Sequence, residues 1–222
     1  MGLSTIILAA GQGTRMRSDL PKVLQPLAGR PLLGHVLDCA AALSADDVCV
    51  VYGHGGEAVR KEFPADSLRW ALQAEQLGTG HAVQQAMPGT PDDNRVLVLF
   101  GDVPLLTPAT CQRLVDETPP ADVAVLTVDM DDPSGYGRII RDGGNVSRIV
   151  EEKDASPDEK TVVEINTGVL VCPADKLKQW LDNLGNDNAQ GEYYLTDVIA
   201  MAVRDGVIAV SYTHLTLPTI QL

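Results

Sequence analysis

Four short apolar runs alternate with segments of helical spacing in this chain, and that alternation narrows the fold more than any other feature. β-Branched residues dominate the runs, which the pattern predicts as strands: residues 5–8, 48–52, 96–100 and 123–128. Helical spacing or a helix-start signal follows three of them, at residues 31–43, 79–87 and 107 onward. Strands that alternate with helices form a mainly parallel sheet. The sequence therefore predicts an α/β fold with a doubly wound sheet and helices on both faces.

Three threonines are candidates for helix caps. A threonine hydroxyl placed just before a helix accepts a hydrogen bond from a backbone N–H of the first turn, and proline is favoured directly after it. We expect Thr79, Thr196 and Thr107, which Pro108 follows, to begin helices in this way. The helix that begins at Thr196 is expected to reach Arg204.

The pattern changes at Gly135. Residues 138–141 and 146–151 flank the sequence Asp-Gly-Gly-Asn, which is typical of a β-hairpin turn. A strand at 162–171 and a helix at 174–184 follow. We therefore expect a small antiparallel β lobe at about residues 135–166 within one compact unit.

Composition excludes several classes of protein. The chain has 222 residues and a formal net charge of -13, which disfavours nucleic acid as a partner because duplex binding depends on clustered Lys and Arg. No apolar run approaches the roughly 20 residues of a membrane helix, and the N-terminus lacks the basic region of a signal peptide. The four cysteines form no Cys-x-x-Cys pair. We expect a cytoplasmic protein with no membrane partner.

A glycine-containing segment follows the first strand. Gly11 and Gly13 allow consecutive backbone N–H groups to turn toward one anion, and Arg15 and Lys22 add positive charge. A tight strand-to-helix turn without a ligand would use the same glycines, so both interpretations remain open at this point. The Gly-Lys-Ser/Thr of a Walker loop is absent, and Met16 stands where a dinucleotide-binding loop would have glycine.

Four polar residues each have a functional and a structural interpretation. Asp102 follows the strand at 96–100, where ligands of doubly wound sheets collect and where a carboxylate suits magnesium, but it could also be a turn aspartate. Gln73 could be a surface amide. Glu151 could belong to a solvated acidic run. Asn166 is an amide within an apolar strand, and such an amide needs hydrogen-bond partners.

Several segments of the chain resemble those of sugar-nucleotide pyrophosphorylases. The first is LAAGQGTR at residues 8–15, with PKVL at 21–24. Four others resemble the uridyltransferase half of bacterial bifunctional N-acetylglucosamine-1-phosphate uridyltransferase/glucosamine-1-phosphate acetyltransferases: LQAEQLGTGHA at 72–82, GDVP at 101–104, DPSGYGR at 132–138 and NAQGEYY at 188–194. The likeness extends from about residue 4 to about residue 210.

This resemblance implies a Rossmann-like nucleotide-diphospho-sugar transferase fold over residues 1–210. It implies transfer of UMP from UTP to N-acetylglucosamine 1-phosphate with Mg²⁺, giving UDP-N-acetylglucosamine and pyrophosphate for peptidoglycan and lipopolysaccharide precursors. Two alternatives stay open. One is a UTP-binding fragment with little turnover, and the other is a pyrophosphorylase for another hexose 1-phosphate.

The resemblance also assigns binding residues. Those for the nucleotide are Leu8, Ala9, Ala10, Gly11, Gln73, Gly78, Thr79, Phe100, Gly101 and Asp102. Gly137, Glu151 and Asn166 would bind the sugar and its N-acetyl group, for which carboxylate and amide groups are suited.

Catalysis is assigned to two cations and one carboxylate. By resemblance, Lys22 bridges phosphates, Arg15 binds the leaving pyrophosphate, and Asp102 holds Mg²⁺. His54 and His81 have no evident Asp or nucleophile partner in the sequence. We expect both histidines to be structural.

The end of the chain departs from the family. Residues 211–222 do not resemble the family's segment, which carries an asparagine as a second magnesium ligand, so we interpret them as an atypical tail that is foreign or frame-shifted. The family normally continues into a β-helix of hexapeptide repeats that acetylates glucosamine 1-phosphate and trimerises. Neither acetyl transfer nor trimerisation is expected of the present 222 residues.

Overall fold

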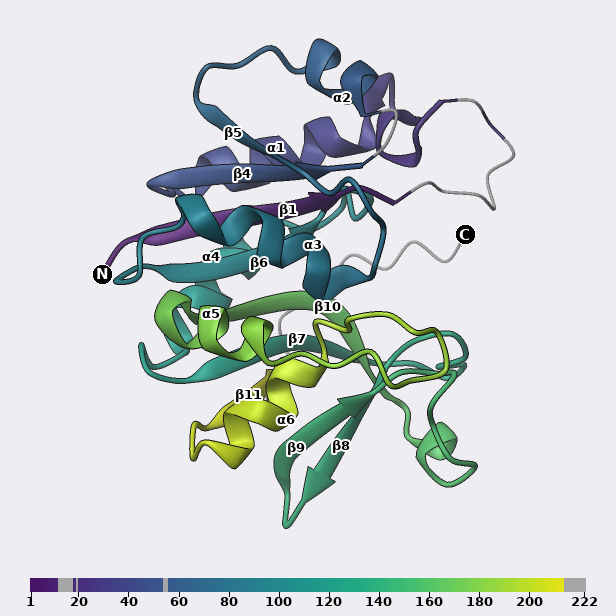
Figure 1. Cartoon of the computed structure of the whole chain (residues 1–222). Helices are drawn as coiled ribbons and strands as arrows, with labels where there is room; N and C mark the ends of the chain where they lie inside the picture. Colours follow the sequence, from purple (N-terminus) through teal and green to yellow (C-terminus); the bar gives the residue numbers. More distant parts are fainter. Residues whose placement is uncertain (12–17, 19, 54–55, 214–222) are drawn as a thin grey trace.

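A nine-stranded sheet forms the centre of the protein (Figure 1). It is seen in a computed structural model that describes residues 1–11, 18, 20–53 and 56–213. Seven strands lie in the order β11-β7-β10-β6-β1-β4-β5. Their bounds are β1 Leu3–Ala9, β4 Asp47–Tyr52, β5 Leu68–Leu72, β6 Arg95–Phe100, β7 Val123–Asp129, β10 Glu164–Pro173 and β11 Ala209–Tyr212.

The sheet is mainly parallel, as the sequence predicts. β1 lies between β4 and β6 and is parallel to both, while β5 is parallel to β4 and β11 to β7. β10 is the exception, because it runs antiparallel to both β6 and β7. Since β1 and β6 are parallel neighbours, their carboxyl ends meet at one edge of the sheet.

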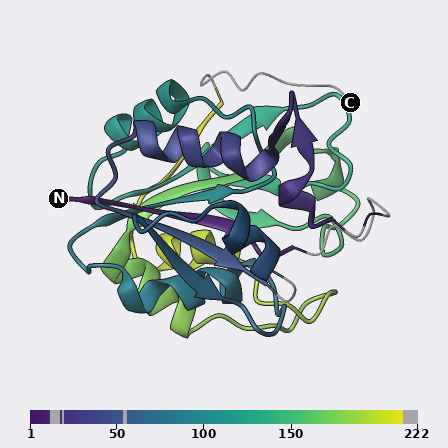
Figure 2. The same cartoon turned by 90° about the horizontal axis from the view of Figure 1, so that it is seen from above.

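Helices cover both faces of the sheet (Figures 1 and 2). Their bounds are α1 Leu32–Ala42, α2 Glu57–Glu62, α3 Thr79–Ala86, α4 Pro108–Glu117, α5 Ala174–Asp182 and α6 Asp197–Arg204. Ile6 packs in one core with α3, α5 and α6, whereas its neighbour Ile7 packs in a second core with α1 and α4. Successive side chains of a strand point to opposite faces, so one apolar run fills both cores.

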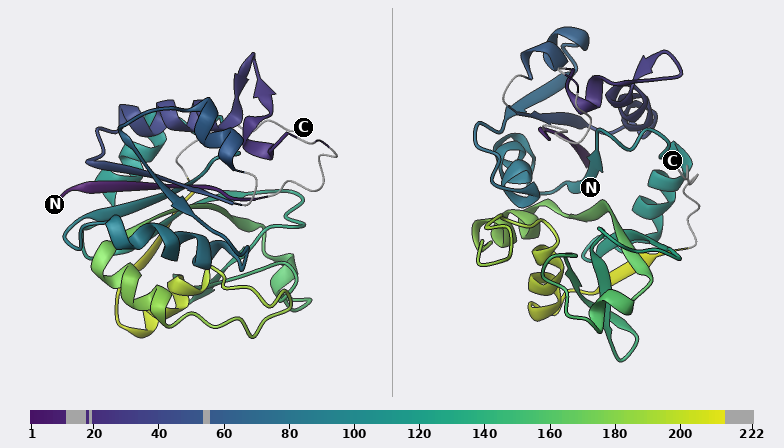
Figure 3. Two further views of the ribbon diagram at one scale, coloured as in Figure 1. Left: turned by 45° about the horizontal axis from the view of Figure 1, so that its top comes forward. Right: turned by 90° about the vertical axis from the view of Figure 1, so that its right-hand side faces the viewer.

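The expected antiparallel lobe is a hairpin that projects from the body (Figure 3). Its strands are β8 Arg138–Asp142 and β9 Asn145–Val150, paired antiparallel. β8 also pairs with β10, through Arg138 opposite Ile165, so the hairpin continues the central sheet. A second, two-stranded sheet joins β2 Pro26–Leu27 to β3 Arg30–Pro31. The remaining short helices are η2 Lys22–Leu24, η3 Met87–Gly89 and η4 Glu159–Thr161.

Only one of the three threonines caps its helix as expected. The Thr107 hydroxyl accepts a hydrogen bond from Thr110 N at 3.2 Å and so caps α4. The prediction for Thr79 is wrong, because Thr79 is the first residue of α3 and its hydroxyl accepts from Leu195 N at 3.0 Å. The prediction for Thr196 is also wrong as regards its side chain, which donates to Glu151 Oε1 at 2.8 Å. In both cases the threonine hydroxyl forms its hydrogen bond with a residue distant in sequence and not with the first turn of its own helix.

The last strand overlaps the segment interpreted as an atypical tail. Ser211 and Tyr212 belong to β11, where they lie opposite Val125 and Leu126 of β7. Residues 214–222 of that segment lie outside the described residues. None of the helices within the described part of the chain has the length and apolarity to cross a membrane.

Candidate functional site

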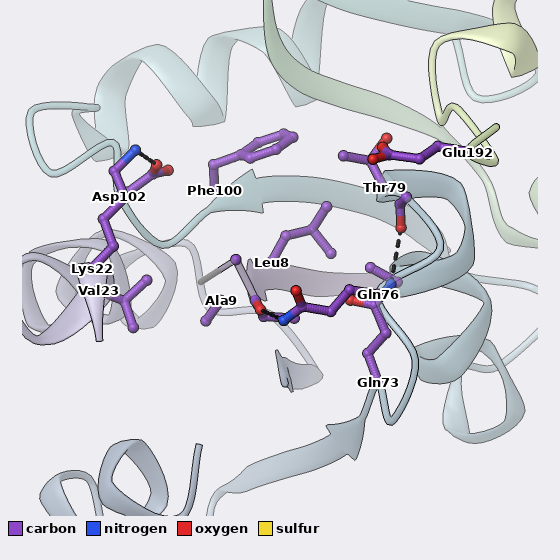
Figure 4. A pocket seen from close by; sticks show the side chains of 14 residues that line it. Leu8, Ala9, Lys22, Val23, Gln73, Gln76, Thr79, Phe100, Asp102 and Glu192 are labelled. Atoms are coloured by element: carbon purple, nitrogen blue, oxygen red, sulfur yellow. Dashed lines mark hydrogen bonds and ion pairs between the residues drawn. The ribbon is translucent and has the colours of Figure 1, made fainter. Parts of the chain in front are cut away.

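Two adjoining pockets open at the carboxyl ends of β1 and β6. The first pocket has a volume of about 250 Å³ (Figure 4) and the second about 230 Å³. Thr79 and Phe100 line both, so the two pockets share a wall. A ligand in one pocket would therefore lie directly beside a ligand in the other.

The first pocket brings together most of the residues assigned to the nucleotide. Those that line it are Leu8, Ala9, Ala10, Gly11, Gln73, Gly78, Thr79, Phe100 and Asp102, together with Lys22. Gly101 is buried beneath them, and its N–H donates to Leu8 O at 2.9 Å. A Cβ at Gly101 would lie 3.2 Å from Leu33 and 3.3 Å from Leu8 O, so glycine allows β6 to end close against β1.

Lys22 and Asp102 form an ion pair at one end of the first pocket (Figure 4). Lys22 begins η2, and Asp102 follows β6. The side chains are 41% and 26% exposed, respectively, so both charges remain within reach of solvent and of a ligand. This end of the pocket therefore holds a cation and a carboxylate that neutralise each other without being buried.

Gln73 lies on the opposite side of this pocket and is only 3% exposed. It is therefore not a surface amide. Its Nε2 donates to Gly78 O at 3.0 Å and is 3.2 Å from His81 Nδ1. Its backbone N–H donates to Tyr52 O at 2.8 Å, which continues the β4–β5 pairing past the end of β5.

Two further residues of the first pocket have no counterpart among the predicted site residues. Gln76 Nε2 donates to Ala10 O at 2.5 Å and ties the loop after β5 to the end of β1. Glu192 lines the same pocket from a segment far along the chain. A glutamine in a polar loop is typical of a solvent-exposed position. The sequence signal for Gln76 is its place in the family-like segment 72–82.

The second pocket contains Gly137, Glu151 and Asn166, the three residues assigned to the sugar. Asn166 sits where β10 changes register against β7. Its Oδ1 accepts from Gly168 N at 3.0 Å. Gly168 has a φ of +89°, and a Cβ there would lie 2.5 Å from the Phe100 ring. Glycine thus permits the irregular turn of strand that exposes the Asn166 amide to the pocket.

Glu151 is not part of a solvated run. Its Oε1 accepts from the Thr196 hydroxyl, and burial raises the pKa of its carboxyl, with Asp154 and Glu192 adding to the effect. The next residue, Glu152, instead forms an ion pair with the buried Arg138 at 2.7 Å. Two adjacent glutamates therefore have opposite environments.

Three residues singled out in the sequence, Gly13, Arg15 and His54, lie outside the described residues. Among the residues that are described, no group of three or more His, Cys, Asp and Glu side chains could hold a metal ion. Two carboxylates, those of Asp102 and Glu192, line the first pocket. Asp102 fits a magnesium ion that takes its other ligands mostly from phosphate oxygens and water.

Comparison with known proteins shows the family to which the chain belongs. Residues 5–155 match the family model of the MobA-like NTP transferase domain. Two similar proteins are both called bifunctional protein GlmU. The one from Azoarcus sp. (strain BH72) is 60% identical over 210 residues, covering 94% of this chain and 46% of that protein. The one from Pseudomonas aeruginosa (strain LESB58) is 59% identical over 212 residues, covering 95% and 46%. The chain thus spans about half the length of these relatives.

A solved structure confirms the predicted fold class. The structure of a UDP-glucose pyrophosphorylase complexed with UDP-glucose superposes with a TM-score of 0.76 at 16% identity. The match covers 96% of this chain and 91% of that one. At this level of identity the likeness concerns the fold alone.

Proposed function

Since the chain belongs to the family of MobA-like NTP transferase domains, we propose that it transfers UMP from UTP to N-acetylglucosamine 1-phosphate, releasing pyrophosphate. The product is UDP-N-acetylglucosamine. The proposal is supported by the uridyltransferase-like segments of the sequence and by the identity of about 60% to GlmU proteins.

One observation carries this proposal most strongly. The first pocket holds the residues assigned to the nucleotide, the second holds those assigned to the sugar, and Thr79 and Phe100 belong to both. The Lys22–Asp102 pair lies in the first pocket, where the phosphates of both substrates would converge. An enzyme that joins two phosphate compounds needs this side-by-side placement, because alignment of the reacting atoms removes much of the barrier.

The reaction proceeds in one displacement. An ionised phosphate oxygen of the sugar phosphate attacks the α-phosphorus of UTP in line and forms a new P–O bond. The bond from the α-phosphorus to the bridging oxygen of the β-phosphate breaks, and pyrophosphate leaves with the electron pair. The nucleophile is already ionised at neutral pH, so no general base is required.

The protein contributes charge and alignment. Lys22 leaves its pairing with Asp102 and binds phosphate oxygens, where negative charge is concentrated as the leaving group departs. Asp102 would hold Mg²⁺, which supplies further neutralisation of phosphate charge when bound. Arg15 is proposed to bind the leaving pyrophosphate on the basis of resemblance alone.

The sugar is bound in the second pocket. The Asn166 amide nitrogen has no partner within the described part of the chain, so it can donate to the carbonyl of an N-acetyl group. Glu151 keeps one carboxylate oxygen for a sugar hydroxyl, because the other accepts from Thr196. Gly137 carries no side chain, and a Cβ there would lie 3.1 Å from Ile149 and 3.5 Å from Glu151.

Pyrophosphate release with UTP and a panel of sugar 1-phosphates tests the proposal. The panel contains N-acetylglucosamine, glucosamine, glucose and mannose 1-phosphates, each measured with Mg²⁺ and with excess chelator. We expect release with N-acetylglucosamine 1-phosphate and Mg²⁺ to exceed every other combination by at least about tenfold. Equal or faster release with another sugar 1-phosphate would replace the proposed substrate.

A further inference from the structure

The side-chain amide of Gln73 has a fixed orientation in the first pocket. Its Nε2 faces two groups, Gly78 O at 3.0 Å and His81 Nδ1 at 3.2 Å. A backbone carbonyl can only accept a hydrogen bond, so the nitrogen and not the oxygen must face Gly78. The second amide hydrogen then points to His81, whose Nδ1 must accept it. The ring proton of a neutral His81 is therefore on Nε2.

This orientation leaves only an acceptor for a ligand. Both hydrogens of the Gln73 amide are used, and its Oε1 has no partner among the residues that the structure describes. The backbone N–H groups of Gly78 and Thr79, which line the same pocket, likewise have no acceptor in the described part of the chain. This side of the first pocket thus presents one acceptor, Gln73 Oε1, together with the unpaired N–H donors of Gly78 and Thr79.

Uracil and cytosine differ in the groups that would meet this wall. The N3 position of uracil is a hydrogen-bond donor beside a carbonyl acceptor, whereas that of cytosine is an acceptor beside an amino donor. An amide held with its oxygen outward accepts from uracil N3–H and repels the lone pair of cytosine N3. A reversed amide would have the opposite preference.

His81 makes reversal of the amide costly. With His81 in place, a reversed Gln73 would set its oxygen against Gly78 O and would force the ring proton of His81 from Nε2 to Nδ1, the less favoured tautomer of a neutral histidine. Without an acceptor at position 81, only the carbonyl of Gly78 would oppose reversal. His81 lies in the first turn of α3, and its ring packs near that of Tyr193 at a centroid distance of 6.5 Å. This ring contact does not involve Gln73.

We infer that His81 is a specificity-determining residue that selects uracil over cytosine by accepting a hydrogen bond from the Gln73 amide. This inference rests on the proposed function, because it requires that the first pocket bind the nucleotide. It goes beyond the expectation that His81 is structural. His81 does not touch the ligand in this account; it acts by positioning Gln73.

Two substitutions separate the acceptor of His81 from its ring. His81→Phe keeps a ring beside Tyr193 but has no acceptor. His81→Asn loses the ring but places Oδ1 at the same bond separation from the backbone as Nδ1. Binding of UTP and of CTP is measured by titration calorimetry for the parent and both variants, and circular dichroism with thermal melting checks that each is folded.

We expect the parent to prefer UTP, and His81→Phe to reduce the ratio of UTP to CTP affinity by about fivefold, which corresponds to one ordinary hydrogen bond. His81→Asn should keep the ratio within about twofold of the parent. The inference is overturned if the Phe variant keeps the parent's ratio, or if the Asn variant loses it as fully as the Phe variant does.

The same titrations distinguish this inference from the proposed function. A parent that prefers UTP, with variants of unchanged ratio, removes the role of His81 and leaves the proposed function intact. A parent that binds neither nucleotide overturns both. If His81→Phe fails to fold, His81→Leu replaces it as a variant without an acceptor and is expected to behave in the same way. If His81→Asn fails to fold, the ratio measured for the variant without an acceptor decides the inference.

Discussion

The Lys22 ammonium group is paired with the Asp102 carboxylate, although the proposed reaction needs each of them to bind a different charge. The pairing joins η2 to the end of β6 at one end of the first pocket. Because both side chains are partly exposed, the ion pair is of modest strength and incoming phosphates can separate it. The two charges thus neutralise each other until the substrates bind.

Replacing Lys22 with alanine should lower kcat by at least about tenfold while the fold stays intact, since it removes a cation next to the reacting phosphates. Steady-state kinetics with UTP and N-acetylglucosamine 1-phosphate measures the change. Lys61→Ala is the matched control, because Lys61 is an exposed residue of α2 and lines neither pocket. Unchanged kinetics in the Lys22 variant would remove this residue from the mechanism.

Asp102→Asn should raise the Mg²⁺ concentration needed for half-maximal activity at least about tenfold, because the amide keeps the shape of the side chain but loses the charge. UTP binding in the presence of chelator should change much less. Activity titrated against Mg²⁺, with calorimetry of metal-free UTP binding, distinguishes the two effects. A variant with the parent's Mg²⁺ response would mean that Asp102 is a structural turn residue.

Asn166→Ala should raise the KM for N-acetylglucosamine 1-phosphate by about fivefold or more and leave the KM for UTP nearly unchanged, because the proposed contact is to the sugar. The control is Asn145→Ala, since Asn145 is exposed at the start of β9, outside both pockets. If the two KM values rise equally at position 166, the substitution has damaged β10 in general and the assigned contact is wrong.

Glu151 and Glu152 should affect stability with opposite dependence on pH. Burial raises the pKa of Glu151 above its ordinary value of 4.5, so the folded state binds its proton more tightly and its contribution to stability is lost as pH rises through the folded pKa. Glu151→Gln should therefore gain stability relative to the parent as pH rises above 4.5. Arg138 holds the pKa of Glu152 below its ordinary value, so its contribution is present above pH 4.5 and is lost as pH falls through the folded pKa.

Both effects are measured by thermal melting of the parent, Glu151→Gln and Glu152→Gln. The pH is varied from about 3.5 to about 7.5, so that it passes through the ordinary and the raised pKa values of carboxyl groups. Relative to the parent, the Glu152 variant should be less stable near neutrality and should approach it in acid. Parallel curves for the parent and the Glu151 variant would show that this carboxyl is not perturbed by folding.

Much of the fold follows from local pattern. The run through Ile6 and Ile7 fills two cores because its residues alternate between faces, and Asp102 lies at the site edge because it directly follows a buried parallel strand. β5 was not predicted, because its sequence, LRWAL, has no β-branched residue. This strand lies at the edge of the sheet. α2 has only six residues, too few for a clear helical period.

The missed parts of the site depend on contacts that no local pattern encodes. Gln76 reaches Ala10, 66 residues earlier in the chain. Thr196 turns from its own helix to Glu151, 45 residues away. His81 is eight residues from Gln73, yet the two meet only because β5 and α3 fold back on each other. Such pairs become visible when the strands bring distant segments to one edge.

The fate of oxygen in a single turnover tests the proposed chemistry most directly. N-acetylglucosamine 1-phosphate carrying ¹⁸O in its phosphoryl oxygens is incubated with the protein, UTP and Mg²⁺, and both products are analysed by mass spectrometry. If the sugar phosphate attacks the α-phosphorus, UDP-N-acetylglucosamine retains all of the label and pyrophosphate carries none. Label in pyrophosphate, or pyrophosphate formed without any nucleotide sugar, would contradict the account.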